Sequence, residues 1–347
     1  MQSAPPVDKS AVIPASMRLM DEHDRVVRYL RLSVTDRCNL RCLYCRSTSK
    51  QPCIPHEKVL RYEECMRLVD IAVEEGIQKI RLTGGEPFVR KGFVDFLRML
   101  RERHPGMDLR VTSNGTLLGE YIKTLRELKI GAINISLDSL RPEGFLAATG
   151  QDLFPVVRRN LDALLAEGIR VKINAVALNG INRQDMKAFL DFARDHPVDV
   201  RFIELMPMGS GAGWLQDQFW PADDILAEAR KWAELEPCRP DAQDRGPARM
   251  FSIVGGQGRL GFITPMSHHF CATCNRLRIT SDGRLRTCLF SDKEYRLRGI
   301  LRHPRLDARF LSRVIELATR KKPLGADILR QRREAAVAAR PMVAIGG

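Results

Sequence analysis

The chain has 347 residues, a length that allows two or three domains. Its content of 44% hydrophobic and 6% aromatic residues is typical of a globular protein. Its net charge of +14, from 56 Lys and Arg against 42 Asp and Glu, favours an anionic partner. No aromatic and basic repeat of a nucleic-acid module occurs, and no apolar run reaches membrane-spanning length. We therefore expect a small phosphate-bearing ligand, with no nucleic acid and no membrane as partner.

The first residues mix proline, serine and charged side chains without the continuous apolar stretch of a secretory signal. Residues 1–24 are expected to form a flexible N-terminal extension. The nine cysteines then indicate a reducing compartment, where thiols serve metals or catalysis rather than disulfides. These observations predict a cytoplasmic protein.

Between residues 29 and 206, short β-rich runs alternate with amphipathic helical patterns. The β-rich runs begin near residues 29, 79, 109, 132, 171 and 200, and the helical patterns lie near 61–75, 92–103, 120–129, 155–167 and 183–194. Gly76, Gly131 and Gly168 stand where helix C-caps are expected. The alternation predicts an α/β fold, an incomplete (β/α)6 TIM-like barrel, in a core domain spanning residues 25–240. In such barrels the active site gathers at the C-terminal ends of the strands.

A cysteine triplet directly follows the first β-rich run. Cys38, Cys42 and Cys45 form a C-x3-C-x2-C pattern. Iron-sulfur clusters normally have four thiolate ligands, so three thiols in one loop suggest a cluster with one iron open to a substrate or cofactor. A zinc knuckle or unrelated core cysteines are the alternatives, although the spacing is not that of a zinc finger and no fourth ligand lies nearby except His56.

The pattern changes after about residue 207 and predicts a smaller C-terminal α+β domain over residues 241–347. It should contain a hairpin over 248–254 and 259–264, followed by a helix from about 307 to 321.

A second triplet lies between the expected hairpin and helix, at Cys271, Cys274 and Cys288. Its C-x2-C-x13-C spacing suits either a second cluster or a structural zinc completed by His268 or His269. Arg276 and Arg278 follow Cys274 and favour the cluster. A purely structural zinc site does not require two guanidinium groups at its edge.

Taken together, these motifs resemble a known family. The first triplet with Tyr44 and the motif Gly84-Gly85-Glu86-Pro87 are similar to those of the radical S-adenosylmethionine (SAM) enzymes. The segments LRLSVTDRCN, LTGGEP, SLDS, FIELMP and CNRLRITSDGRLRTCLF, with a terminal double glycine, resemble the GTP 3′,8-cyclases of molybdenum cofactor biosynthesis. The resemblance runs from about residue 25 to the C-terminus.

The resemblance implies a function and cofactors. The family's members are lyases that convert GTP to (8S)-3′,8-cyclo-7,8-dihydroguanosine 5′-triphosphate, using a 5′-deoxyadenosyl radical that abstracts hydrogen from C3′. The first triplet would hold a [4Fe-4S] cluster that binds SAM, and the second a [4Fe-4S] cluster that binds the guanine. A flavodoxin or ferredoxin would supply electrons, and a cyclic pyranopterin monophosphate synthase would take the product. The assembly could be a homodimer.

The resemblance also implies roles by position. The residues implied to hold SAM are Tyr44, Gly85, Glu86, Ser136 and Met206, and those implied to contact GTP are Arg31, Arg81, Thr112, Lys172, Arg276, Leu277 and Arg278. Gly346 and Gly347 would enter the active site as a catalytic tail, since a chain without side chains can thread a narrow space. Without the resemblance, Met206 would be read as core packing, Gly85 as a turn, the basic residues as surface charges and the terminal glycines as a frayed end.

Some positions depart from the family pattern or receive no role. Arg46-Ser47 follows Cys45 where the family usually has Met-Pro, and Ser113 replaces a common Thr while keeping the hydroxyl. Cys53, Cys65 and Cys238 belong to neither triplet.

Two other functions would account for some of these features. A radical SAM enzyme that modifies a peptide or RNA, with the second cluster for electron transfer, would share the same core. Its peptide-modifying relatives tend to carry more cysteines near the C-terminus. A non-catalytic regulator that binds zinc or a cluster would explain the thiols and the basic charge, but not the GGEP motif, Tyr44 or the terminal glycines.

Overall fold

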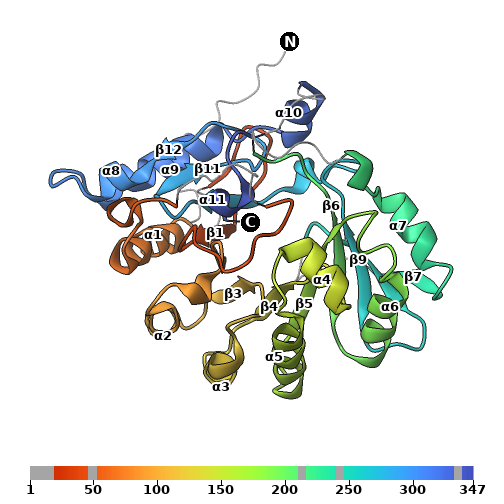
Figure 1. Cartoon of the computed structure of the whole chain (residues 1–347). Helices are drawn as coiled ribbons and strands as arrows, with labels where there is room; N and C mark the ends of the chain where they lie inside the picture. The colour runs from red at the N-terminus through yellow and green to blue at the C-terminus, as the bar shows by residue number, and fades with distance from the viewer. Residues whose placement is uncertain (1–18, 46–52, 210–215, 240–245, 332–337, 347) are drawn as a thin grey trace, which may run out of the picture.

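The computed structural model describes residues 19–45, 53–209, 216–239, 246–331 and 338–346. Within these ranges the strands form one twelve-stranded sheet, which curves into an open barrel (Figure 1). Its centre consists of six neighbouring parallel strands, namely β1 (Tyr29–Ser33), β2 (Lys79–Thr83), β3 (Asp108–Ser113), β4 (Ala132–Ser136), β5 (Val171–Ala177) and β6 (Asp199–Glu204). The predicted α/β partial barrel is confirmed.

Helices connect these strands and cover the outside of the sheet (Figure 1). They are α1 (Tyr62–Glu74), α2 (Phe93–Arg103), α3 (Ile122–Glu127), α4 (Pro142–Thr149), α5 (Phe154–Ala166) and α6 (Met186–Asp195). Gly76 and Gly168 take the left-handed conformation with φ of 95° and 67°, as expected after helix ends. The prediction for Gly131 is wrong, because Lys129 takes the left-handed position there with φ of 49°.

The C-terminal part extends the sheet at both edges. The expected hairpin is present as β8 (Arg249–Ile253) and β9 (Arg259–Ile263), with β7 (Leu235–Pro237) beside β8, and β9 pairs in parallel with β6. At the other edge β10 (Arg276–Ile279) pairs in parallel with β1 and is followed by β11 (Arg284–Arg286) and β12 (Tyr295–Arg296). The strands that follow β6 in the sequence therefore extend the sheet at both of its edges. The predicted domain boundary at residue 240 stays a prediction.

The remaining helices are α7 (Ala222–Ala229), α8 (Leu297–Leu301), α9 (Ala308–Arg320), α10 (Gly325–Gln331) and α11 (Met342–Ile345). The predicted terminal helix corresponds to α9. Short 3-10 turns occur at His56–Lys58, Pro87–Val89, Gly119–Tyr121, Gln216–Gln218 and Cys271–Thr273. The last helix, α11, lies beside β1 near the C-terminus (Figure 1).

The start of the described chain is folded against the barrel. Leu19 and Asp21 are buried, and Asp21 forms an ion pair of 2.7 Å with Arg25. Residues 19–24, which we assigned to a flexible extension, are thus packed, while residues 1–18 of that prediction lie outside the described residues.

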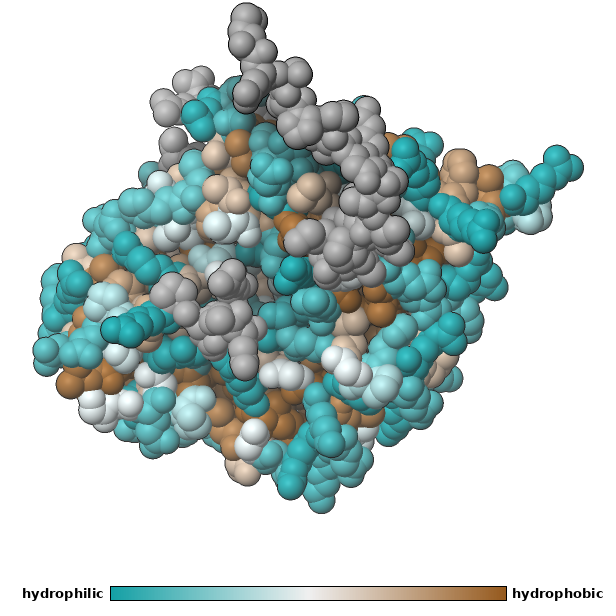
Figure 2. Space-filling view, turned by 180° about the vertical axis from the view of Figure 1, so that it is seen from behind, coloured by the Kyte–Doolittle hydropathy of each residue, from teal (hydrophilic) through white to brown (hydrophobic). Residues whose placement is uncertain are grey.

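Successive side chains along each central strand point alternately to the apolar core and to the inside of the barrel. Leu30 and Leu32 of β1 are buried in the apolar core, whereas Tyr29 and Arg31 line the inside of the barrel. The same alternation in the neighbouring strands gives the barrel an apolar outer layer and a polar interior. On the face seen from behind, hydrophilic side chains cover much of the described surface, with apolar side chains between them (Figure 2). None of the described helices is both long and apolar enough to cross a bilayer.

Candidate active site

A cavity of about 1650 Å³ occupies the inside of the barrel. Sites for a single small ligand usually measure about 300–1000 Å³. Both cysteine triplets line this cavity, so the topology brings together residues that are more than 200 positions apart. The space is large enough for two nucleotide-sized molecules.

The first triplet lies in the loop after β1, at the C-terminal end of the strand. The Leu40 amide donates to Cys38 Sγ at 3.4 Å, and the Asn114 side-chain amide donates to the same sulfur at 3.7 Å. Burial raises the pKa of the Cys42 thiol well above its ordinary value, and the charges of Asp138, Cys45 and Cys38 act in the same direction. Three converging thiols with N–H donors to sulfur fit an iron-sulfur cluster, whose properties depend on such hydrogen bonds.

The GGEP motif holds this loop in place. Amides of Gly85 and Glu86 donate to the carbonyls of Thr35 and Arg37 at 2.7 and 2.8 Å. A Cβ on Gly85 would lie 2.3 Å from the Arg37 carbonyl oxygen, so only glycine permits this approach. The glycine pair therefore admits the backbone of the cysteine loop, and the predicted contact of Gly85 with SAM stays a prediction.

Glu86 is fully buried below the motif. Its carboxylate accepts hydrogen bonds from the Phe88 amide, the Ser113 hydroxyl and the Asn114 amide at 3.2, 3.0 and 2.6 Å. Burial raises the pKa of Glu86 to about 7, although these three donors lower it. Glu86 is not among the residues that line the cavity. Its side chain therefore joins the loops after β2 and β3, and its predicted contact with SAM stays a prediction.

Tyr44, Ser136 and Met206 line the cavity, and Met206 also packs against an apolar cluster that contains Phe290 and Ile345. The Tyr44 hydroxyl donates to the Asp138 carboxylate at 2.8 Å, and Asp138 also accepts from the Val176 amide at 2.8 Å. Asp138 was not selected from the sequence, although it belongs to the SLDS segment. It fixes the aromatic ring beside the cysteines.

Two thiols of the second triplet lie beside Gly325, at the start of α10. A Cβ on Gly325 would lie 3.1 and 3.3 Å from the sulfurs of Cys288 and Cys271, so these thiols crowd a position that has no side chain. Burial raises the pKa of the Cys274 thiol, but the Lys322 and Arg276 charges bring it down to about 7. Thiols with cationic neighbours, gathered around a glycine, fit a second cluster.

The zinc alternative involved two histidines. His268 Nε2 lies 3.0 Å from Asp223, and His269 Nδ1 lies 2.7 Å from the Pro265 carbonyl. In the part of the chain that the structure describes, no three His, Cys, Asp or Glu side chains are arranged to hold a single metal ion.

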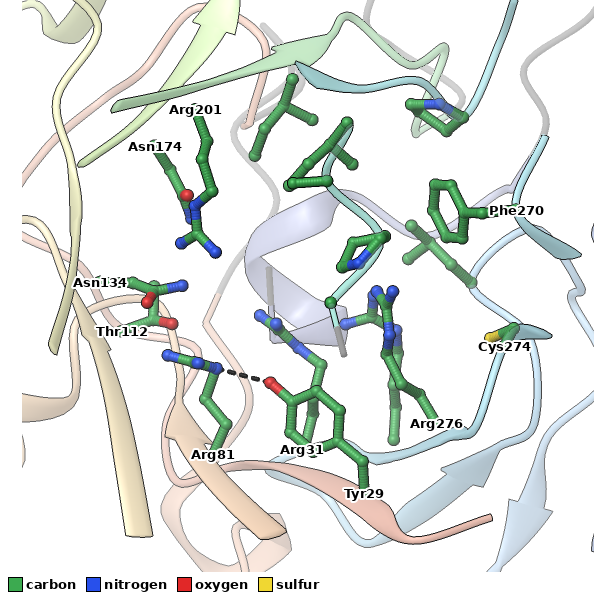
Figure 3. A pocket seen from close by; sticks show the side chains of 18 of the residues that line it. Tyr29, Arg31, Arg81, Thr112, Asn134, Asn174, Arg201, Phe270, Cys274 and Arg276 are labelled. Atoms are coloured by element: carbon green, nitrogen blue, oxygen red, sulfur yellow. Dashed lines mark hydrogen bonds between the residues drawn. The ribbon is translucent and has the colours of Figure 1, made fainter. Parts of the chain in front are cut away.

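Basic side chains, among them Arg31, Arg81 and Arg276, line the cavity wall (Figure 3). Arg31 faces Arg81 on one neighbouring strand and Arg278 on the other. Burial lowers the pKa of Arg31 to about 10 and that of Arg278 well below its ordinary value, with nearby guanidinium groups acting in the same direction. Such crowding of buried cations favours binding of an anionic ligand.

Several of these groups already have partners. The Arg81 guanidinium donates to the Tyr29 hydroxyl at 2.6 Å, and Lys172 pairs with Asp199 at 3.2 Å. Arg276 lies over the Phe270 ring at 5.2 Å. Oxygens of Thr112, Asn134 and Asn174 are buried without a hydrogen-bond partner in the described structure, and all three residues line the cavity (Figure 3). Orphaned polar atoms on a cavity wall indicate a polar ligand.

The chain's end reaches this wall. Gly346 has φ of +82°, and Arg278 donates to its carbonyl at 3.4 Å. Upstream, Arg340 pairs with Asp282 at 3.0 Å and Glu294 at 3.4 Å, which holds the tail on the barrel. Gly346 is thus buried beside Ser33 and Thr83, but it is not among the residues that line the cavity, and its catalytic role stays a prediction. Gly347 lies outside the described residues.

Comparison with known proteins identifies the family. The description Radical SAM superfamily matches residues 32–193, and Molybdenum Cofactor Synthesis C matches residues 198–328. GTP 3′,8-cyclase from Heliobacterium modesticaldum is 40% identical over 88% of this chain and 93% of its own length. GTP 3′,8-cyclase from Syntrophomonas wolfei is 43% identical over 82% and 87%. The chain belongs to the GTP 3′,8-cyclase family.

Among solved structures, Streptococcus suis SuiB bound to S-adenosylmethionine superposes with a TM-score of 0.61 at 14% identity. The match covers 92% of this chain and 77% of SuiB, and it supports the fold alone. Membership of the GTP 3′,8-cyclase family, within the radical SAM enzymes, gives the chain a [4Fe-4S] cluster and SAM as cofactors.

The expected substrate contact of Leu277 needs correction, and the departure from the cyclase family at Arg46-Ser47 is not tested. The Leu277 side chain is 2% exposed and packs in the apolar core, so a contact with substrate would have to use its backbone. Arg46 and Ser47 lie outside the described residues. Cys65 is buried in the core, Cys53 is exposed and Cys238 lines the cavity.

The sequence reasoning missed Tyr29, Asn134, Asn174 and Arg201, which face the cavity of this cyclase family member (Figure 3). The signal that could have found them is the alternation of polar and apolar residues within each buried strand. Tyr29 is the most informative of them. Burial raises its pKa, but the charges of Arg81, Arg31 and Arg276 bring it down to about 7.

Proposed function

We propose that this protein converts GTP to (8S)-3′,8-cyclo-7,8-dihydroguanosine 5′-triphosphate, the first step of molybdenum cofactor biosynthesis. The observation that carries the proposal is that two cysteine triplets and a wall of basic side chains line one cavity. A triphosphate carries several negative charges, which arginine forks bind in bidentate fashion.

Cys38, Cys42 and Cys45 would hold the first cluster, and its open iron would bind SAM. Tyr44, Gly85, Ser136 and Met206 line the neighbouring space and would position SAM. When bound, the cluster and SAM supply the 5′-deoxyadenosyl radical that removes hydrogen from C3′ of GTP. The enclosing barrel excludes water and directs the radical to one carbon atom.

Cys271, Cys274 and Cys288 would hold a second [4Fe-4S] cluster that receives the guanine base. Arg31, Arg276 and Arg278 would bind the triphosphate from neighbouring strands, and Arg81, Lys172 and Thr112 would complete the wall. Both triplets and the basic side chains line the same cavity, which supports a nucleotide bound close to both clusters. Gly346 and Gly347 would close the site near the ribose.

The wider setting follows from the chemistry. SAM cleavage needs one electron, which a flavodoxin or ferredoxin would supply. The cyclised nucleotide would pass to a cyclic pyranopterin monophosphate synthase. Both steps suit a cytoplasmic protein, which could act as a homodimer.

The proposal is tested with anaerobically reconstituted protein, SAM, dithionite and each nucleoside triphosphate in turn. We expect GTP alone to drive formation of 5′-deoxyadenosine and to yield an isomer of GTP by mass spectrometry. Cleavage of SAM that does not depend on any nucleotide would instead favour a peptide or RNA substrate.

A further inference from the structure

We propose that Lys322 and Arg25 form a buried cationic clamp that positions the three cysteines of the second triplet and offsets their negative charge. Both residues act through other groups and are positioning residues. The inference rests on the proposed function in one respect, namely that the second triplet binds an iron-sulfur cluster.

Lys322 ties two of the cysteine-bearing segments together. The residue is 2% exposed, and its ammonium group donates to the carbonyls of Arg276 at 2.9 Å and Thr287 at 2.5 Å. Arg276 follows Cys274 by two residues, and Thr287 directly precedes Cys288. One side chain therefore sets the distance between the segments that carry these two thiols.

Arg25 ties the third segment to Lys322. Its guanidinium donates to the Cys271 carbonyl at 2.7 Å, to the Lys322 carbonyl at 2.7 Å and to the Pro323 carbonyl at 3.2 Å. Asp21 holds the same guanidinium through Nε at 2.7 Å. The clamp thus links all three cysteine segments through residues from both ends of the chain.

The charges of the two cations are balanced differently. Arg25 has Asp21 as its counter-ion, whereas Lys322 pairs with no carboxylate among the residues that the structure describes. A buried ammonium group without an opposite charge is unfavourable. Thiolates of a loaded triplet would supply that charge, because Lys322 contacts the backbone two residues after Cys274 and directly before Cys288. The site is therefore arranged for a negatively charged occupant.

The experiment isolates the second cluster in a variant whose first triplet is replaced by alanines at Cys38, Cys42 and Cys45. Lys322→Met is introduced into this background, with the neighbouring exposed residue in Lys321→Met as the matched control. Iron content and the reduction potential of the reconstituted protein are measured by chemical analysis and by titration monitored with electron paramagnetic resonance.

The background protein and the Lys321→Met control should bind about four irons per chain. Lys322→Met should lose at least half of this iron, or keep it with a more negative reduction potential, because a positive charge and hydrogen-bond donors near the thiolates are gone. Equal iron content and equal potential in Lys322→Met and its control would overturn the proposal.

A second variant keeps the test decisive if Lys322→Met does not fold. Arg25→Lys retains the positive charge but cannot reach all three carbonyls, so it should also bind less iron than the control. Unchanged iron content and potential in that variant would contradict the clamp. Neither readout needs GTP, so failure of the cyclase assay in the natural protein would leave this result interpretable.

Discussion

Replacing Gly346 by alanine should remove the tail from the active site without unfolding the protein. The added Cβ would lie 2.7 Å from Ser33 Cβ and 2.8 Å from Thr83 Oγ1. It would also force a left-handed conformation on alanine, at a cost of roughly 1–2 kcal/mol. Overpacking of a filled site costs about 1–3 kcal/mol.

Together these terms disfavour the docked tail by about 2–5 kcal/mol, or roughly 30-fold to several thousand-fold in population. Only the last residues need to move, because Arg340 keeps its ion pairs with Asp282 and Glu294, so the melting temperature should change little. The rate of GTP cyclisation at saturating GTP and SAM should fall by at least about tenfold if the docked tail is needed. Iron content should stay the same.

Gly106→Ala is the matched control, because a Cβ there meets no atom within 4 Å. Cyclisation is followed by mass spectrometry and unfolding by circular dichroism. A Gly346→Ala protein with the full rate of cyclisation and an unchanged melting temperature would refute the reasoning about the tail.

Three further predictions concern the loop, the basic wall and the tail's anchor. Gly85→Ala should lose the first cluster, because its Cβ would lie 2.3 Å from the Arg37 carbonyl oxygen, and full iron content with normal SAM cleavage would contradict this. The KM for GTP should rise as the pH increases through about 7, since Tyr29 then gains a negative charge beside the proposed phosphate site. The Tyr29→Phe variant should show a smaller rise, and an equal slope in both proteins would count against the assignment. Although burial raises the pKa of Asp282, hydrogen bonds from Arg340 and its neighbours lower it to about 2. This pKa lies below its ordinary value, so the stabilisation is present above about pH 4 and is lost as the pH falls towards 2. Urea unfolding of the metal-free protein should show Asp282→Asn to be less stable by about 2 kcal/mol at pH 7 and nearly equal at pH 2, whereas a pH-independent difference would disprove the linkage.

Much of the barrel could be predicted because buried parallel strands and amphipathic helices have distinct periods. The helix over 142–149 was missed because it is short and lies only four residues before α5. The pairing of β9 with β6 and of β10 with β1 could not be predicted, because a strand's partner depends on contacts far apart in the sequence.

The site was predictable where a residue type is unusual, and less so where it is common. Cysteines at cluster spacing and a glycine pair are rare signals, so the triplets and Gly85 were found. Tyr29 and Asn174 are ordinary residues whose place on the inner wall emerges only from the register of the strands. Lys322 gave no signal at all, since its importance depends on two carbonyls from distant segments.

The most direct test of the account uses GTP that carries deuterium at C3′. The reconstituted protein is incubated anaerobically with this substrate, SAM and dithionite, and 5′-deoxyadenosine is analysed by mass spectrometry. We predict transfer of one deuterium into 5′-deoxyadenosine, together with a cyclised nucleotide that has lost it. Unlabelled 5′-deoxyadenosine, with deuterium retained in all nucleotide products, would contradict the proposed reaction at C3′.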